Sequence, residues 1–243
     1  MRINRCYICI FALGLLISNA KASIGEAEKA STVLETLSNS NRDKVVPSAE
    51  KIMERASSLF TDKEGVSIRF EMITKNNQSA LIDSNRGILK MDHLKYMLKT
   101  DVSQSWYDGS TQWSYLIDTE EVNILKPSSE ELLESNPYLF LFSYRDLFEI
   151  KLLSEDEKTS NQMISRALYS VELIPKDDDY PYQKIILGID TISYQISLMK
   201  IFMTDGNAMD LTVQEFRTGI KYPTGTFQFV SGLLPDAEVI DLR

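Results

Sequence analysis

The sequence predicts a mainly β domain of the α+β class, built on one large, curved antiparallel sheet or barrel. Three observations support this prediction: many short runs in which apolar and polar residues alternate, two Asp-Gly turns that each join two such runs, and one amphipathic helix ahead of them. The chain has 243 residues, of which 43% are hydrophobic and 25% charged. This is enough for one globular domain with an extension.

A helix is expected directly after Ser48, a suitable N-cap residue. Its apolar stripe has a spacing of 3.6 residues and consists of Ile52, Met53, Ala56, Leu59 and Phe60. From Gly65 onwards the period changes to two, which is typical of strands with one apolar face. The expected strands, roughly ten in number, cover residues 66–72, 87–91, 94–98, 104–107, 112–117, 122–125, 169–173, 185–189, 194–198, 209–213 and 227–229.

Residues 127–148 interrupt the strands. Ser128 or Ser129, followed by Glu130 and Glu131, opens a short helix with carboxylates in its first turn, and Pro137 ends it. The apolar stretch that follows, residues 138–142, is either a buried segment of the core or a lid over a lipid-sized cavity.

The N-terminus has the pattern of a secretory signal peptide. Arg2 and Arg5 precede an apolar run of about a dozen residues, and a small-x-small cleavage site ends at Ala22. We therefore expect residues 1–22 to be removed on export to the periplasm, residues 23–47 to form a linker or short helix, and residues 48–243 to form the domain.

Composition excludes several functions. Cleavage removes three of 26 basic residues and none of the 35 acidic ones, so the net charge changes from −9 to −12. Such acidity argues against nucleic acid and anionic membrane surfaces as partners. The chain has one histidine, His93, and both cysteines lie in the signal peptide. We therefore expect no metal, no cofactor and no catalytic residues; a hydrolase that depends on His93 or Asp92 is a remote alternative.

The hairpin over residues 104–117 gathers both tryptophans. Trp106, Trp113, Tyr115 and Ile117 share one face whether the loop is Asp108-Gly109 or residues 108–111, because both loops have even length. This face is either an aromatic core or the wall of an acyl-chain cavity. Adaptable methionine side chains in the strands suit the second interpretation; they are Met72, Met91, Met97, Met199, Met203 and Met209.

Five segments resemble LolA-like periplasmic lipoprotein carriers in their order along the chain, from about Ser48 to Arg243. Residues 106–115, WYDGSTQWSY, resemble the family's D-G-K-T-x-W-x-Y segment, and Asn136-Pro137-Tyr138-Leu139 resembles its N-P-x-x-L region. Residues 173–176, LIPK, resemble its L-x-P-K strand. The C-terminal FQF (227–229) and AEVIDLR (237–243) are similar to the family's F-x-F and V-I-D-x-R ending, especially in members from the Bacteroidetes.

The resemblance implies an incomplete antiparallel barrel of about ten or eleven strands, with short helices that form a lid over an apolar cavity. It implies a carrier that shields the acyl chains of lipoproteins between an inner-membrane exporter and an outer-membrane acceptor. We expect a monomer. The candidate cavity residues are Phe70, Met72, Leu89, Met91, Tyr96, Leu98, Trp106, Trp113, Tyr115, Leu139, Phe140 and Phe142.

One departure from the family bears on the lid. An arginine that tethers the lid in the family aligns with Met91 here, and Lys90 or Arg86 could substitute for its charge. The alternatives are therefore a LolA-like paralogue that carries another lipid, and a non-enzymatic module of the cell envelope that docks a protein partner.

Overall fold

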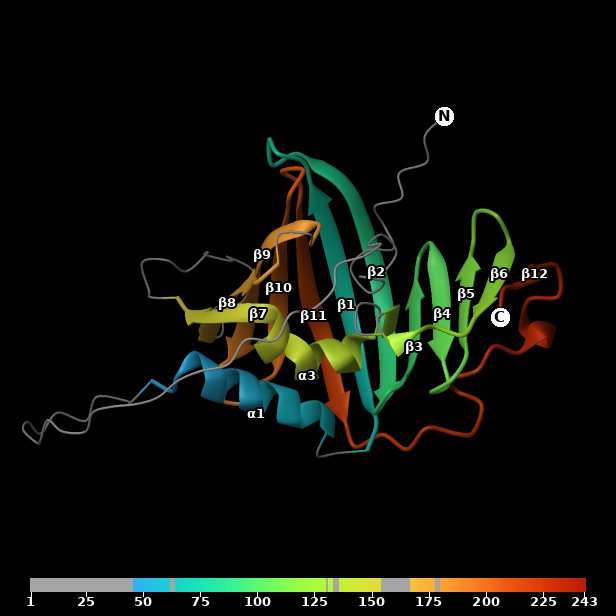
Figure 1. Cartoon of the computed structure of the whole chain (residues 1–243), viewed down its shortest axis with the longest axis horizontal. Helices are drawn as coiled ribbons and strands as arrows, with labels where there is room; N and C mark the ends of the chain where they lie inside the picture. Colours follow the sequence, from blue (N-terminus) through green and yellow to red (C-terminus); the bar gives the residue numbers. More distant parts are fainter. Residues whose placement is uncertain (1–45, 62–63, 130, 133–135, 154–166, 178–179) are drawn as a thin grey trace, which may run out of the picture.

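The computed structural model describes residues 46–61, 64–129, 131–132, 136–153, 167–177 and 180–243 (Figure 1). The predicted signal peptide and residues 23–45 of the predicted linker lie outside these ranges. The described residues form one open sheet of twelve strands that does not close into a barrel, with few helices. The predicted mainly β fold, an incomplete barrel with a small helical cover, is confirmed.

Neighbouring strands are antiparallel except at one edge, where β12 runs parallel to β6. Across the sheet the strands are β12 (Glu238–Asp241), β6 (Glu121–Leu125), β5 (Gln112–Leu116), β4 (Ser103–Tyr107), β3 (Lys95–Thr100), β2 (Leu81–Asp92), β1 (Val66–Lys75), β11 (Ala208–Thr218), β10 (Ile196–Met203), β9 (Tyr182–Asp190), β8 (Leu168–Pro175) and β7 (Phe148–Leu152).

Two helices pack on one face of this sheet. Helix α1 (Ala49–Thr61) begins after Ser48, whose Oγ accepts a hydrogen bond from the Lys51 backbone N–H at 3.4 Å, as the N-cap prediction requires. Helix α3 is Pro137–Leu147. No helix in the described ranges is long and apolar enough to cross a membrane.

The short helix predicted before Pro137 begins with a reciprocal capping box. The Ser128 N–H donates to Glu131 Oε2 at 2.7 Å, and the Glu131 N–H donates to Ser128 Oγ at 3.2 Å. The apolar stretch after it becomes α3, because Pro137 occupies a first helical position, where its missing N–H is no loss. Pro137 therefore separates two helical segments.

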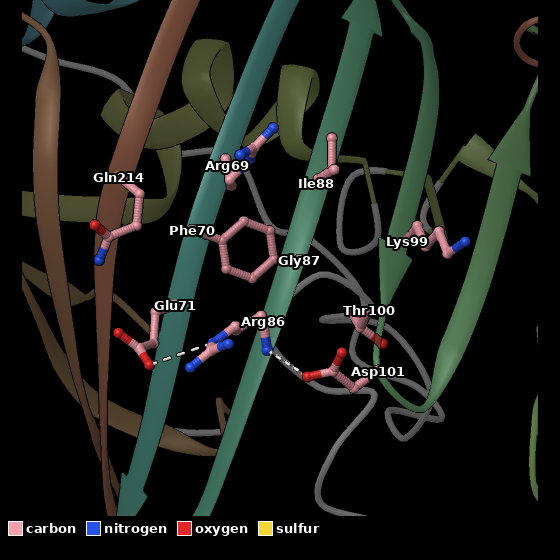
Figure 2. Close-up of a pocket in the computed structure, with 10 residues that line it drawn as sticks. All are labelled: Arg69, Phe70, Glu71, Arg86, Gly87, Ile88, Lys99, Thr100, Asp101 and Gln214. Carbon is pink, nitrogen blue, oxygen red and sulfur yellow. Dashed lines mark hydrogen bonds and ion pairs between the residues drawn. The ribbon is translucent and has the colours of Figure 1, made fainter.

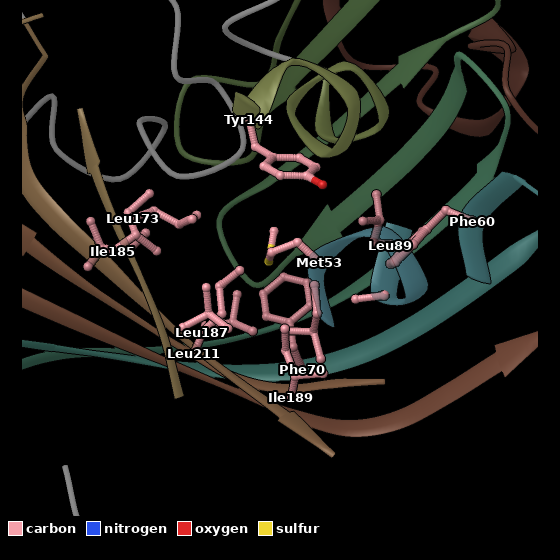
Figure 3. Packing of buried hydrophobic residues seen from close by; sticks show 14 of the residues in the cluster. Met53, Phe60, Phe70, Leu89, Tyr144, Leu173, Ile185, Leu187, Ile189 and Leu211 are labelled. Carbon is pink, nitrogen blue, oxygen red and sulfur yellow. The ribbon is translucent and has the colours of Figure 1, made fainter. Parts of the chain in front are cut away.

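The alternation along the strands defines two faces. The helix face carries Phe70, Leu89 and Leu187, and buried side chains of α1 such as Met53 and Phe60 pack against it (Figure 3). The Phe60 ring meets Phe216 of β11 edge to face, with centroids 5.4 Å apart. The opposite side of the sheet, which we call the outer face, carries the intervening residues.

The hairpin of β4 and β5 has the longer of the two predicted loops, because Tyr107 lies opposite Gln112. Asp108 Oδ1 accepts hydrogen bonds from the backbone N–H groups of Ser110 and Thr111 at 3.0 and 2.9 Å. Gly109, with a φ of 101°, supplies the left-handed conformation that the loop requires.

Two local predictions fail, and one strand was not predicted. Residues 227–229 form no strand, because Phe227 packs edge to face on Tyr222 and is buried, and the terminal strand is β12 instead. Tyr194 lies in a turn with a φ of 58°, so β10 begins only at Ile196. Strand β7 was not predicted, since it follows α3 without a loop.

Candidate ligand-binding face

Six of the predicted cavity residues lie together on the helix face. In the register, Met91 is opposite Tyr96 and Leu89 is opposite Leu98 on β2 and β3, so their side chains share one face. The six side chains are buried in the core cluster that also contains α1; they are Phe70, Met72, Leu89, Met91, Tyr96 and Leu98.

Tyr96 extends this face towards β4. Its ring lies 5.9 Å from that of Tyr107, at an interplanar angle of 32°. Burial raises the pKa of the Tyr96 phenol, and the neighbouring Tyr107 raises it further. Burial and then Asp108 raise the pKa of Tyr107 as well. Both phenols therefore stay uncharged at neutral pH and present an apolar ring with a polar tip.

Trp106, Trp113 and Tyr115 lie on the outer face. Trp106 and Trp113 are opposite each other, so the predicted parity of the hairpin holds. Trp106 is also opposite Met97, which lies between the helix-face residues Tyr96 and Leu98. The twelve residues therefore do not share one face, because parity shows which residues lie together but not on which side of the sheet.

The C-terminal segment covers Trp106. The Phe229 ring lies 5.6 Å from that of Trp106, and Gln228 Nε2 donates to Asp108 Oδ2 at 3.2 Å. Further back, the Tyr222 hydroxyl donates to the Val66 carbonyl at 2.8 Å. Trp106 is thus part of a second packed layer, apart from the helix face.

The remaining predicted residues, Leu139, Phe140 and Phe142, belong to α3. Leu139 is half-buried, and the side chains of Phe140 and Phe142 lie outside the described part of the structure. One turn further along α3, Tyr144 is buried in the core cluster and reaches over the helix face (Figure 3).

Polar contacts hold α3 at both ends. Asn136, which is 1% exposed, donates from Nδ2 to the Leu94 carbonyl at 2.8 Å, in the turn between β2 and β3. At the other end, Lys176 Nζ donates to the Arg145 carbonyl at 2.8 Å. Sequence reasoning included Asn136 only as part of a motif and did not predict that it attaches the helix to the sheet.

Contacts between the two helices are exposed. Arg145 of α3 lies 3.8 Å from Glu54 of α1, and these side chains are 56% and 69% exposed. Exposed ion pairs of this kind contribute about 0–1 kcal/mol. Helix α1 also contacts the turn before β10, where Arg55 donates to the Tyr194 hydroxyl at 2.6 Å and its guanidinium group lies over the Tyr194 ring.

A groove of about 450 Å³ lies on the outer face across β11, β1, β2 and β3 (Figure 2). Arg86 lies 3.7 Å from Glu71, and its backbone N–H donates to Asp101 Oδ2 at 3.0 Å. Charges of both signs line the groove together with Ile88, so it has no strong preference for either sign. Sequence reasoning did not predict this groove.

Within the described residues, no three His, Cys, Asp or Glu side chains are grouped so that they could hold a metal ion. His93 Nδ1 lies 2.9 Å from Asp92 Oδ1, and His93 sits in an exposed turn with a φ of 53°. The helix face itself presents apolar side chains together with the phenols of Tyr96 and Tyr107.

Comparison with protein families decides the identification. A family model described as outer membrane lipoprotein carrier protein LolA matches residues 40–207, more than half of the chain. The chain belongs to this LolA family. No curated protein sequence matches the chain.

A solved structure shows the same fold as this LolA family member. It is that of an uncharacterized conserved protein from Thermus thermophilus, with 11% identity and a TM-score of 0.52, and the match covers 79% of this chain and 98% of the other. A LolA superfamily protein from Nitrosomonas europaea has 12% identity and a TM-score of 0.38, over 76% of this chain and 99% of the other.

Met91 stands where the LolA-like pattern described above has an arginine. Met91 is buried on the helix face between Val66 and Tyr96, where a thioether makes no ion pair. Alternation along β2 places Lys90 and Arg86, the suggested substitutes for the family's arginine, on the outer face. Near Met91, α3 is attached to the sheet by the hydrogen bond from Asn136 to the Leu94 carbonyl.

Proposed function

We propose that this protein is a periplasmic carrier that holds the acyl chains of lipoproteins on the helix face of its sheet and carries them from the inner to the outer membrane. The observation that carries the proposal is the extent of this apolar face. It runs from Phe148 on β7 to Tyr107 on β4, and in the described structure α1, α3 and Leu132 of the short helix before Pro137 cover it.

Adaptable side chains on the helix face suit reversible binding. The ion pair between α1 and α3 is exposed and weak, so the helices are held on the face by buried side chains such as Met53 and Tyr144. Met53 of α1 and Met72 and Met91 of the sheet belong to the buried cluster on this face, and flexible thioether side chains adapt to chains of different shape. Each buried methylene of the cargo contributes about 0.8 kcal/mol.

The proposal includes export and partners. The chain is made with a signal peptide that is cleaved after Ala22, acts as a monomer without catalysis, receives cargo from an inner-membrane exporter and gives it to an outer-membrane acceptor. Family membership supports these roles.

Native mass spectrometry of the protein, after periplasmic expression with residues 1–22 intact, tests the proposal. We expect a mature chain that starts at Ser23 and retains acylated peptides. Leu89→Ser, on the helix face, should reduce retention about tenfold or more, since it removes apolar contact along the bound chain. Ile88→Ser on the outer face is the matched control, and circular dichroism confirms that both variants fold.

The identity of the retained molecule separates the alternatives. Phospholipid or free fatty acid in place of acylated peptide would indicate a LolA-like paralogue with another cargo. Protein that is empty, and that also fails to take up lipoprotein from membranes, would refute the carrier function and leave the docking module.

A further inference from the structure

Two buried polar atoms on the helix face have no hydrogen-bond partner. Thr74 on β1 is 6% exposed and Asn85 on β2 is 4% exposed, and neither Thr74 Oγ1 nor Asn85 Oδ1 is paired in the described structure. Asn85 Nδ2 donates to Asp83 Oδ2 at 3.4 Å, so only the amide oxygen is unpaired. Buried polar atoms without partners destabilise a fold, and few occur in native proteins.

The two side chains are neighbours on one face of the sheet. Thr74 lies opposite Asp83, and Met72 lies opposite Asn85. Thr74 and Asn85 are therefore diagonal neighbours, with Cα atoms roughly 7–8 Å apart and side chains closer than that. One small group bound between them can contact both.

Their position along the strands is also informative. The hairpin end of β1 and β2 extends beyond α1 and α3 (Figure 1). Along the helix face of β2, the side chains change from polar Asp83 and Asn85 to apolar Leu89 and Met91. An amphipathic ligand on this face would place its polar end at Thr74 and Asn85 and its chain along the apolar residues.

The donors and acceptors identify the polar group. Asn85 Oδ1 requires a donor, and the Thr74 hydroxyl can donate or accept. An amide offers an N–H donor and a carbonyl acceptor together, whereas an ester linkage offers acceptors only. We propose that Thr74 and Asn85 form a subsite for the amide linkage of an N-acylated ligand. The ligand N–H donates to Asn85 Oδ1, and the Thr74 hydroxyl donates to the ligand carbonyl.

This inference rests on the proposed carrier function and is tested with two probes that differ by one group. The probes are N-hexadecanoylglycine methyl ester and its analogue in which an ester oxygen replaces the amide N–H. Calorimetric titration of the mature protein should show about tenfold tighter binding of the amide, the effect expected of one buried hydrogen bond.

Two variants remove the subsite without a loss of volume. Asn85→Leu should reduce the preference for the amide to within about twofold, while the ester analogue binds as before. Thr74→Val should weaken both probes alike and keep the preference, because both carry the carbonyl to which the Thr74 hydroxyl donates. Both substitutions remove an unpaired polar atom, so we expect no loss of thermal stability. Ser84→Ala is the control, because Ser84 is exposed on the outer face beside Asn85 and should keep the preference.

The outcomes are distinct. Equal binding of both probes by the wild-type protein would overturn the subsite and leave the carrier function standing. A preference that survives in Asn85→Leu, or binding of both probes that is unchanged in Thr74→Val, would also overturn it. Failure of both probes to bind would count against the carrier function itself.

Discussion

The Phe70 ring occupies the space where a side chain of Gly87 would be. The two residues lie opposite each other on β1 and β2, and a Cβ built on Gly87 would lie 2.2 Å from Phe70 Cζ. Phe70 is 1% exposed, so its ring has no free volume to enter. The missing side chain at Gly87 thus lets an aromatic ring lie flat across two strands in the centre of the helix face.

Gly87→Ala should therefore destabilise the fold by about 1–3 kcal/mol, the usual cost of overpacking a core. Urea unfolding measures this loss. Phe70→Leu combined with Gly87→Ala should recover part of it, because the smaller side chain leaves room for the methyl group. Purely additive losses in the double mutant would show that the contact is not the cause.

The hairpin loop at Asp108 predicts a pH dependence. Burial alone would raise the pKa of Asp108, but hydrogen bonds from the N–H groups of Thr111 and Ser110 and from Gln228 lower it below its usual value. A carboxyl with a lowered pKa stabilises the fold above its unfolded pKa of about 4, and this contribution is lost as the pH falls through the folded value.

The difference in unfolding free energy between wild type and Asp108→Asn should therefore be larger at pH 6 than at pH 3. Urea titrations at the two pH values measure it. Asp118→Asn, at an exposed position in the next turn, is the control and should show a smaller change. A difference for Asp108→Asn that is equal at both pH values would contradict the proposed hydrogen-bond stabilisation.

Asn136→Ala should loosen the beginning of α3. The variant loses the hydrogen bond to the Leu94 carbonyl, worth about 1 kcal/mol. Hydrogen exchange at the backbone amides of α3 should become faster, and bound acyl ligand should dissociate faster. Lys176→Met removes the exposed bond at the other end and should have a smaller effect. Unchanged exchange in Asn136→Ala would exclude Asn136 as an attachment point.

Much of this fold could be predicted because periodicity is strong where one face is buried. Helix α1 and strand β1 follow their apolar patterns, and the Asp108 loop follows its turn residues. Strand β7 also alternates, with Phe148, Ile150 and Leu152 on one face, but it continues directly from α3 without a turn signal. Because no loop separates α3 from β7, the sequence pattern did not show where the helix ends and the strand begins.

The candidate site was harder to predict because large apolar or aromatic side chains occur on both faces of β3 and β4. Tyr96 and Tyr107 lie on the helix face, while Met97 and Trp106 alternate with them on the outer face. Neither set is polar, so alternation alone does not indicate which side is covered by helices. The assignment requires the register to β1 and the path of the C-terminal segment, and both are long-range features.

This two-layer arrangement leads to a last prediction. Phe229→Ala should uncover Trp106, which is 5% exposed, and destabilise the fold by about 1–2 kcal/mol, because an aromatic contact and buried area are lost. Tryptophan fluorescence should shift to longer wavelength as water reaches the ring. Retention of acylated peptide should stay at the wild-type level, since the sheet separates Trp106 from the helix face. Loss of retention in a folded Phe229→Ala protein would instead place the binding surface on the outer face.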